Sequence, residues 1–301
     1  MSFGTEPLWL REALRLQQQT EYPQIGAATD DSPFVLTSFG GRQFFQIVYA
    51  DGSRFVVDGR AKLLWGACPA PLTDEDLATY LVGPILGFVL RRRGKTALHA
   101  SCVSLCGRAV VLCGASESGK STTAAALALR GMSVLAEDIS PVKEEGRGFS
   151  IEPAYPRVCL WPGAVEALLG NPSALPCLTP TWEKRYLPLD GVRATFEPRR
   201  RELGAIYLLA PRVEGASAPR IEELTRRDAL LQLVQNTYMN WLLDATQRAV
   251  ELDVLARIVE QVPVRRLVPH RDPARIGGLC DLLVNDAERL LGRRAFAAAG
   301  A

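Results

Sequence analysis

The stretch Leu98–Val142, LHASCVSLCGRAVVLCGASESGKSTTAAALALRGMSVLAEDISPV, decides the fold of this 301-residue chain. At its centre, Gly114–Ser121 reads GASESGKS and fits the pattern G-x-x-x-x-G-K-[ST] at every fixed position. Such a loop turns successive backbone N–H groups toward phosphate oxygens, because its glycines permit a tight curve. Residues 109–113 predict a buried strand, and residues 122–130 predict a helix that ends at Gly131. The sequence therefore predicts a nucleotide-binding strand, loop and helix.

The residues of the loop have predicted roles in holding ATP and Mg²⁺. Lys120 is expected to place its ammonium against the outer phosphates, and Ser121 to offer its hydroxyl to Mg²⁺. The helix that follows points its positive end at the anion. Glu117 is expected to point to solvent, because a carboxylate beside phosphates is unfavourable. The predicted nucleotide-binding residues are Gly114, Ala115, Ser116, Glu117, Ser118, Gly119, Lys120, Ser121 and Thr122.

Two sequence features beside the loop predict how its neighbouring strands are arranged. A second apolar run, Ala97–Leu105, is separated from the loop strand by the short turn 106–108, which predicts an antiparallel hairpin with His99 on its first strand. Beyond the helix, the strand 133–136 ends in Glu137–Asp138. Since the acidic pair follows the loop lysine by only 17 and 18 residues, we expect its strand to lie next to the loop, with both carboxylates at the phosphate end.

This constellation resembles the catalytic domain of HPr kinase/phosphorylase and, more distantly, ATP-dependent phosphoenolpyruvate carboxykinase. The family pattern is a His on a strand, a short turn, a strand, G-x-S-G-x-G-K-S, a helix ending in Arg-Gly and a strand ending in Asp-Asp. The chain departs from it with Glu117 in place of Gly and Glu137 in place of the first Asp. Residues 153–162, PAYPRVCLWP, more loosely resemble HPr-kinase-related proteins found beside peptide-tailoring genes, including lasso-peptide clusters. The glycine-rich segment that carries phosphorylase activity has no counterpart.

The resemblance implies an α/β fold with an HPr kinase/phosphoenolpyruvate carboxykinase-like P-loop core. The length suggests about two domains. Residues 1–72 are expected to form a small β-rich N-terminal module, built around the hairpin turn Asp51-Gly52, and residues 73–301 the kinase domain. Within the latter, Thr73 is expected to cap a helix that runs to about residue 93 with a kink near Pro84.

Composition excludes several classes of function. The net charge of +2 argues against a generally basic nucleic-acid surface. Seven cysteines without a C-x-x-C pair indicate reduced thiols and no zinc site. The beginning of the chain lacks the apolar core of a signal peptide, and no apolar run reaches the ~18 residues that a membrane span needs. We therefore expect a cytoplasmic protein without membrane or nucleic-acid partners, and the oligomeric state stays open, a homo-oligomer included.

Three side chains around the loop have expected catalytic roles. Asp138 follows the strand end and is expected to bind Mg²⁺, partly through water. Glu137 is expected to act as the general base for an acceptor hydroxyl or to support the metal. A lone His on a strand is often a core residue, but the resemblance implies that His99 contacts phosphate or positions the acceptor. The predicted metal ligands are therefore Ser121 and Asp138.

Cations are also expected to neutralise the transferring phosphoryl group. Arg157, Lys184 and Arg185 flank a Pro-containing loop over residues 171–182, and each is either solvated or part of the site. We favour Arg185. The predicted catalytic residues are His99, Lys120, Glu137, Asp138 and Arg185.

The leading prediction is an ATP- and Mg²⁺-dependent kinase that phosphorylates a hydroxyl, expected to be Ser, on a peptide or small protein. By resemblance alone, the acceptor could be the C-terminal Ser of a lasso-peptide precursor. Three alternatives stay open: a serine kinase acting on HPr protein, a kinase of free serine, and a nucleotide-dependent switch without a phosphoacceptor. The sequence carries no motif that selects ATP over GTP or identifies the acceptor.

Overall fold

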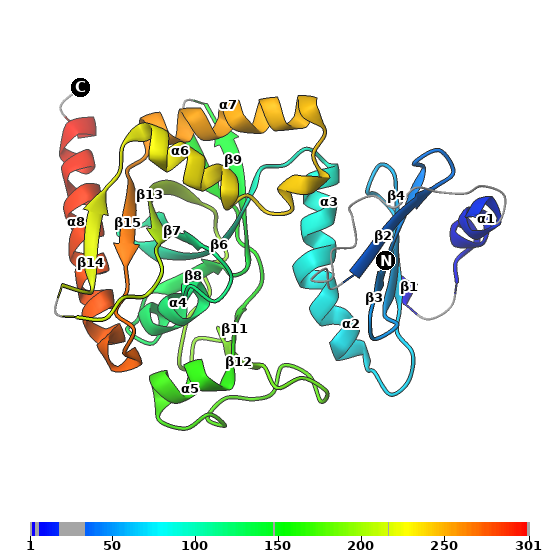
Figure 1. Cartoon of the computed structure of the whole chain (residues 1–301), viewed down its shortest axis with the longest axis horizontal. Coiled ribbons are helices and arrows are strands. Elements are labelled where there is room, and N and C mark those ends of the chain that lie inside the picture. Colours follow the sequence, from blue (N-terminus) through cyan, green and yellow to red (C-terminus); the bar gives the residue numbers. More distant parts are fainter. Residues whose placement is uncertain (1, 4–5, 18–33, 147, 216, 300–301) are drawn as a thin grey trace. The chain divides into compact units, whose positions relative to one another are not determined.

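The hairpin and loop expected over residues 97–128 form the centre of a mixed α/β unit in the computed structural model (Figure 1). The structure describes residues 2–3, 6–17, 34–146, 148–215 and 217–299. The chain divides into two units. The first extends to Lys95 and also takes in Thr179–Trp182 and Trp241–Asp244. The second begins at Thr96 and contains the remaining residues.

The first unit contains a five-stranded sheet in the order β1-β5-β4-β3-β2. Its described elements are β1 (Ser2–Phe3), α1 (Leu8–Gln17), β2 (Phe34–Phe39), β3 (Phe44–Tyr49), β4 (Arg54–Asp58) and β5 (Leu64–Ala67). The strands β2 to β5 pair antiparallel in chain order, because short turns join them. Gly52 turns β3 into β4 with a φ of 87°, as the Asp-Gly signal predicted. Leu10 and Ala13 of α1 pack on Trp65 and Val56 of the sheet.

The helix expected after Thr73 also belongs to the first unit. It consists of α2 (Asp74–Tyr80), a π-helical turn η1 (Leu81–Ile85) and α3 (Leu86–Arg92). Thr73 and Asp76 form a reciprocal capping box, and the predicted kink lies at Pro84, where Gly83 has non-helical backbone angles. The expected division after residue 72 assigned this helix to the second domain, whereas here the first unit extends to Lys95.

The second unit is built on a sheet in the order β10-β9-β6-β7-β13-β15-β14, with β8 paired to β6. Its strands are β6 (Ala97–Leu105), β7 (Arg108–Gly114), β8 (Ser133–Ala136), β9 (Ile139–Glu145), β10 (Gly148–Ile151), β13 (Arg201–Leu209), β14 (Arg220–Glu223) and β15 (Val264–Val268). The β6–β7 hairpin is antiparallel, as predicted, whereas β7, β13 and β15 run parallel. The sheet is therefore mixed.

Strand direction brings the loop and the acidic pair to one edge of this sheet. Both β7 and β8 are antiparallel to β6, so both end where β6 begins. Ala100 pairs with Cys113, just before the loop, and His99 pairs with Ile139, just after Asp138. We expected β8 to lie directly beside the loop strand. It lies one strand away instead, with β6 between them.

Helices cover both faces of the sheet. The helices of the second unit are α4 (Lys120–Ala128), α5 (Pro162–Leu169), α6 (Arg226–Gln235), α7 (Ala245–Gln261) and α8 (Ile276–Ala299), with the 3₁₀ turns η2 (Asn240–Leu242, which continues into the first unit) and η3 (Pro273–Arg275). Apolar residues of α4 and α8 share one buried cluster with Val110 and Leu112. Residues of α6 and α7 share another with Val111 and Ile206. Because neighbouring strand residues point to opposite faces, β7 contributes to both.

The long helix expected from Thr225 to Leu243 is interrupted. Helix α6 ends at Gln235, and the next residues bond to the beginning of β6 instead. The carbonyl of Asn236 accepts from the N–H of His99 at 2.8 Å, and the N–H of Tyr238 donates to the carbonyl of Ala97 at 2.8 Å. These bonds satisfy backbone groups that helix continuation would otherwise have used.

A two-stranded antiparallel ribbon completes the second unit. It pairs β11 (Arg157–Leu160) with β12 (Arg185–Pro188). The sequence predicted an extended segment for the first strand but not its partner, which follows the expected Pro-containing loop.

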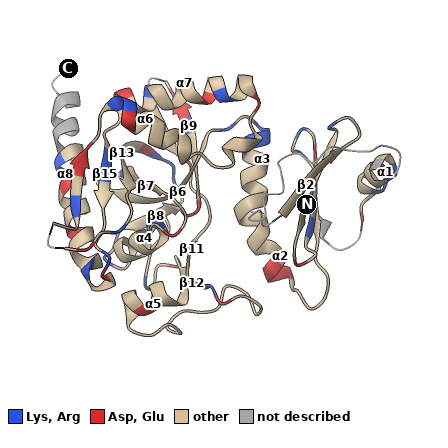
Figure 2. Cartoon of the chain, in the orientation of Figure 1, with Lys and Arg blue, Asp and Glu red and all other residues tan. Residues whose placement is uncertain are grey.

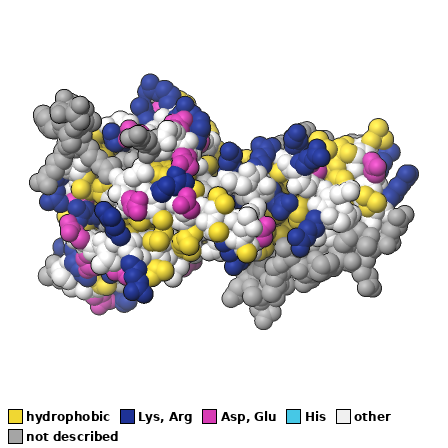
Figure 3. All heavy atoms as spheres, turned by 90° about the horizontal axis from the view of Figure 1, so that it is seen from above, with side chains coloured by type: hydrophobic (Ala, Val, Ile, Leu, Met, Phe, Trp, Pro, Cys, Tyr) yellow, Lys and Arg dark blue, Asp and Glu magenta, His cyan; other side chains and the backbone are white. Residues whose placement is uncertain are grey.

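Charged residues of both signs are interspersed along α6, α7 and α8 (Figure 2). One face of the second unit likewise mixes Lys and Arg with Asp and Glu in the space-filling view (Figure 3). Over the part of the chain that the structure describes, no helix has the length and apolar character required to span a bilayer.

Candidate active site

The loop between β7 and α4 is shaped by two glycines. Gly114 has a φ of 156°, and an added Cβ would lie 2.6 Å from Ser118 Oγ and 3.1 Å from the carbonyl oxygen of Leu209. Gly119 has a φ of 105° and precedes the first residue of α4. Neither position accepts a side chain without strain. The loop residues Ala115, Ser116 and Glu117 are exposed, so the side chain of Glu117 lies in solvent as expected.

Lys120 is folded back over this loop. Its Nζ donates to the carbonyl oxygens of Gly114 at 2.8 Å and Ala115 at 2.9 Å. The side chain is almost fully buried, and burial lowers the pKa of Lys120. The ammonium is therefore held inside the curve of the loop, where a phosphate oxygen could replace either carbonyl as its partner.

Ser121 connects the loop to the acidic pair. Its Oγ donates to Glu137 Oε1 at 2.7 Å, and the hydroxyl of Tyr155 donates to Glu137 Oε2 at 3.2 Å. Glu137 is only 4% exposed. Burial first, and then the neighbouring Asp138, raise the pKa of Glu137 to about 7, against the opposing effects of Ser121, Lys184 and Tyr155. A carboxylate in this setting is suited to accept a proton.

Asp138 and His99 meet at the same edge. Asp138 Oδ1 lies 3.3 Å from His99 Nε2. The backbone of Asp138 is in the left-handed region with a φ of 66°, a conformation that Asp tolerates better than most residues, and its carbonyl accepts from the N–H of Ala100 at 3.1 Å. The ring of Tyr238 meets the His99 ring edge-on with 6.0 Å between centroids. His99, Glu137, Asp138, Lys120 and Ser121 are thus brought together, as the sequence predicted.

The oxygen atoms at this edge fit Mg²⁺. Ser121, Glu137 and Asp138 supply hydroxyl and carboxylate oxygens, which Mg²⁺ prefers, and Mg²⁺ commonly takes its remaining ligands from phosphate and water. Among the described residues, no three His, Cys, Asp or Glu side chains are grouped so that they could hold a metal without such help. Ser121 and Asp138 remain the residues that would hold the ion beside a bound nucleotide.

The β11–β12 ribbon presents a second set of side chains to Glu137. Val158 pairs with Leu187 and both are buried, so Arg157 and Cys159 point to the other face. The Arg157 guanidinium lies 5.4 Å from the centre of the ring of Tyr155, whose hydroxyl donates to Glu137, so this face lies close to the acidic pair. Burial and then Glu137 raise the pKa of Cys159 to about 12. One residue beyond β11, Trp161 is 54% exposed, and Lys184 Nζ lies 4.8 Å from the centre of its ring.

Arg185, the predicted catalytic cation, lies on the opposite face of the ribbon. It pairs with the buried Leu160, and its guanidinium donates to Cys177 Sγ at 2.8 Å and the Leu175 carbonyl at 3.5 Å. Because side chains alternate along a strand, a shift of one residue exchanges the two faces. Lys184, one residue earlier, therefore lies on the face that carries Arg157 and Cys159, and its charge opposes the rise in the pKa of Glu137.

One further cation was missed from the sequence. An added Cβ on Gly119 would lie 3.2 Å from Arg212 Nη2, so the Arg212 guanidinium lies over the entrance to α4. Arg212 follows β13, which runs parallel to β7 and ends beside Gly114. The sequence signal was a basic residue soon after a buried strand. To interpret this signal one would have had to know that β13 neighbours β7, the strand that precedes the loop.

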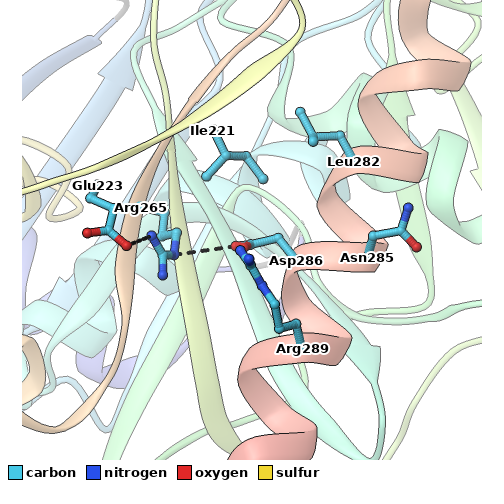
Figure 4. Close-up of a pocket in the computed structure, with 7 residues that line it drawn as sticks. All are labelled: Ile221, Glu223, Arg265, Leu282, Asn285, Asp286 and Arg289. Atoms are coloured by element: carbon cyan, nitrogen blue, oxygen red, sulfur yellow. Dashed lines mark hydrogen bonds and ion pairs between the residues drawn. The ribbon is translucent and has the colours of Figure 1, made fainter.

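A separate pocket of about 520 Å³ lies between β14, β15 and α8 (Figure 4). Its centre is Asp286, which accepts from the Tyr207 hydroxyl at 2.9 Å and from Arg289, while Arg265 lies 3.4 Å away and also donates to Glu223. Two carboxylates face two guanidinium groups, so the charges balance. None of the predicted site residues lines it. We interpret this network as the anchor between α8 and the sheet.

No protein-family model matches the chain, and a search of curated proteins found no match either. Among solved structures, the chain is similar to the HPr(Ser) kinase/phosphatase from Coxiella burnetii, with 14% identity and a TM-score of 0.34. The similar region covers 68% of this chain and 96% of that chain. Because the identity and the TM-score are both low, the function proposed below rests on the residues of this chain.

Proposed function

We propose that this protein is an ATP- and Mg²⁺-dependent kinase that transfers a phosphoryl group to a hydroxyl, with Ser of a peptide as the acceptor. The observation that carries the proposal is the 2.7 Å hydrogen bond between Ser121 and Glu137. It joins the first turn of the helix behind a phosphate-type loop to a buried carboxylate. Nucleotide-binding and proton-accepting groups thus occupy one edge of the sheet.

The loop side of this edge binds the nucleotide. Backbone N–H groups between Gly114 and Ser121 surround the phosphates, and Lys120 exchanges its carbonyl partners for phosphate oxygens. Arg212, above Gly119, adds a second positive charge. Ser121 and Asp138 would hold Mg²⁺, which when bound supplies charge neutralisation between the outer phosphates.

The acidic pair prepares the acceptor. Glu137 takes the proton of the acceptor hydroxyl. The hydroxyl oxygen forms a bond to the γ-phosphorus, and the bond from that phosphorus to the ADP oxygen breaks. Tyr155 orients the second oxygen of Glu137. His99 fixes the carboxylate of Asp138 from the other side. Most of the catalysis then comes from positioning and from the cations around the transferring group.

The ribbon favours a peptide as the acceptor. It offers Lys184, Arg157 and the half-exposed ring of Trp161 on the face beside Glu137. An extended segment with acidic and apolar groups suits such a face, whereas a small molecule usually needs an enclosed pocket. A lasso-type precursor with a Ser at its C-terminus is the acceptor we propose, and this last step rests on the sequence resemblance alone.

Mass spectrometry tests the proposal. The chain is incubated with ATP and Mg²⁺ and, separately, with a lasso-type precursor, HPr protein and free serine, and Lys120→Ala serves as the inactive control. We expect one phosphoryl group on the precursor only. Transfer to HPr or to serine alone would contradict the peptide assignment and leave the kinase proposal standing. ATP hydrolysis without a labelled acceptor in any reaction would instead favour a nucleotide-dependent switch.

A further inference from the structure

The face of the ribbon that carries Cys159 also carries two cations, one near each end. Arg157 is the first residue of β11, and Lys184 comes directly before β12. Between them lies the pair formed by Cys159 and Tyr186. The two cations occupy positions about 13 Å apart along the strands. A single carboxylate is too small to bridge that distance, so each cation has surroundings of its own.

Arg157 is half-buried and lacks a partner of opposite charge. Its Nε is wholly buried, and its guanidinium makes no hydrogen bond or ion pair with any residue that the structure describes. Other half-buried arginines of the second unit do have partners, since Arg185 donates to Cys177, and Arg201 and Arg265 donate to carboxylates. A guanidinium removed from water without an anion is unfavourable. An anion bound here would offset that cost.

The ring of Tyr155 fixes where this guanidinium lies. Arg157 Cζ is 5.4 Å from the centre of the ring, and the Tyr155 hydroxyl donates to Glu137 Oε2 at 3.2 Å. The guanidinium is therefore at most roughly 11 Å from Glu137 Oε2, a span that about three residues of extended peptide cover. All three residues belong to the second unit, so this placement rests on contacts inside one unit.

The nucleotide loop approaches Glu137 from a different direction. Ser121 donates to Oε1 of Glu137 at 2.7 Å, whereas Tyr155 donates to Oε2. Lys120, the cation expected at the phosphates, is held by carbonyl oxygens of the loop. The two oxygens of one carboxylate thus separate the loop from the ribbon. An anion at Arg157 therefore lies on the acceptor side of Glu137.

The chemistry of a guanidinium favours a carboxylate as its partner. Its planar fork of N–H groups matches the two oxygens of a carboxylate. Unmodified peptides carry this group in Asp, in Glu and at the C-terminus. At the other end of the same face, Lys184 lies over the Trp161 ring and likewise has no carboxylate partner among the described residues. An acidic peptide therefore suits this face better than a neutral one.

We propose that Arg157 binds a carboxylate of the acceptor, on a residue within about three positions of the hydroxyl that receives the phosphoryl group. The carboxylate belongs to an acidic side chain or to the C-terminus, and the guanidinium donates parallel hydrogen bonds to both of its oxygens. This assignment rests on the kinase function proposed above and adds a requirement on the acceptor. Arg157 selects acidic peptides and holds their hydroxyl near Glu137.

Steady-state kinetics with synthetic peptides test this requirement. All of the peptides share one Ser and end three residues after it. The first has Asp two residues after the Ser and an amidated C-terminus, the second has Asn in place of Asp, and the third keeps Asn but has a free C-terminal carboxylate. We expect the KM of the neutral second peptide to exceed that of an acidic peptide about tenfold. Whichever acidic peptide has the lower KM identifies the source of the carboxylate.

Variants of Arg157 connect this preference to the guanidinium. Arg157→Met removes the charge from an unbranched side chain, and it should raise the KM of the preferred acidic peptide about tenfold but that of the neutral peptide less than about twofold. Arg157→Lys keeps the charge without the fork and should retain part of the preference; it also decides the question if Arg157→Met does not fold. The matched control is Arg227→Met, at an exposed position in α6, which should change neither KM.

The comparison between peptides also separates this role from an indirect effect on Glu137. Loss of the contact with the Tyr155 ring would alter kcat for acidic and neutral peptides alike. Loss of a carboxylate-binding residue alters the KM of the acidic peptide only. The ATP KM should stay unchanged in every variant.

Arginine labelling with phenylglyoxal gives a readout that does not depend on turnover. Mass spectrometry of fragments from the labelled chain compares Arg157 with Arg227. The preferred acidic peptide, at twice its Kd, should slow the labelling of Arg157 about threefold and leave that of Arg227 unchanged. The neutral peptide and a non-hydrolysable ATP analogue should protect neither residue.

Equal KM values for acidic and neutral peptides, together with unprotected Arg157, would overturn the carboxylate assignment. A preference for acidic peptides that survives in Arg157→Met would assign the carboxylate to another cation and overturn it as well. Protection of Arg157 by the ATP analogue alone would overturn it in favour of a nucleotide contact. If the wild-type chain phosphorylates none of the peptides, the proposed function fails, and the labelling rates alone decide whether Arg157 binds a carboxylate.

Discussion

The nucleotide side and the acceptor side of the candidate site are assembled in different ways. The nucleotide side, in which we now include His99 and the acidic pair, comes from one continuous stretch, Leu98–Asp138. A short turn joins β6 to β7, and the loop and α4 join β7 to β8. The acceptor side comes from the ribbon, whose two strands are separated by α5 and by a long loop, four residues of which belong to the first unit. Local connections fix register firmly, whereas the ribbon register depends on pairing between distant segments. The structure of the nucleotide side could therefore be predicted from the sequence, and that of the acceptor side could not.

The two sides also differ in burial. Lys120 and Glu137 are nearly inaccessible, so their charges are desolvated and act strongly at short range. Lys184 is half-buried, and Trp161 beside it is half exposed. We therefore expect changes on the nucleotide side to abolish transfer, and changes on the acceptor side to alter affinity by smaller factors.

The largest effect is expected from Lys120→Ala. Removing the ammonium from the loop should lower kcat at least ~100-fold, comparable to the loss of one preorganised charge-stabilising group. Transfer of labelled phosphate measures this, and circular dichroism checks that the fold persists. A variant that turns over near the wild-type rate would show that the loop does not serve phosphoryl transfer.

A second pair of variants separates the roles of the two carboxylates. Glu137→Gln should lower the single-turnover rate ~100-fold with little change in nucleotide affinity, because the amide cannot accept the hydroxyl proton. Asp138→Asn should instead raise the Mg²⁺ concentration required for half-maximal rate. Should Glu137→Gln weaken nucleotide binding and leave the single-turnover rate intact, Glu137 supports the metal and is not the base.

A smaller effect is expected from substituting the cation on one face of the ribbon, and substitution of the cation on the opposite face serves as the control. Lys184→Ala should raise the acceptor KM about tenfold, since a partly shielded cation contributes on the order of 1–2 kcal/mol to binding an anionic group. Arg185→Ala changes a neighbouring cation on the opposite face and should leave that KM within about twofold. Equal effects of the two substitutions would mean that the ribbon register does not select the acceptor-binding residue.

The smallest expected effect concerns Arg212. It is exposed, so its interaction with a nucleotide phosphate is screened by water. Arg212→Ala should weaken nucleotide affinity up to about fivefold, measured by titration calorimetry with a non-hydrolysable ATP analogue, and the loss should shrink as salt is added. Salt-independent affinity in both proteins would place Arg212 outside the nucleotide site.

Much of the nucleotide side could be predicted because each step had a local physical cause. Gly107 allowed the hairpin, Gly114 and Gly119 permitted the loop, and Gly131 followed the helix that leads into β8. The order of strands could not be read in the same way. We placed β8 beside the loop strand, but pairing energies across a sheet are not local, and β6 lies between them.

The features that were not predicted from the sequence share one cause. Lys184 and Arg185 are adjacent cations, and only the pairing of Leu160 with Arg185 shows which face of the ribbon each of them occupies. Helix α6 was predicted too long for a similar reason, because the bonds that end it are made by β6, more than a hundred residues earlier. Arg212 required knowledge that β13 neighbours β7. In each case a contact distant in sequence decided between locally equivalent choices.

Strand β6 has a consequence for how this chain can vary in evolution. It is the common antiparallel partner of β7, β8 and β9, so the nucleotide loop, the acidic pair and His99 are all aligned against the same nine residues. A single inserted or deleted residue inside β6 would misalign three pairings at once and turn His99 to the other face of the sheet. We therefore expect related chains to differ in length within residues 171–174, which pair with no strand, and to keep β6 free of insertions and deletions.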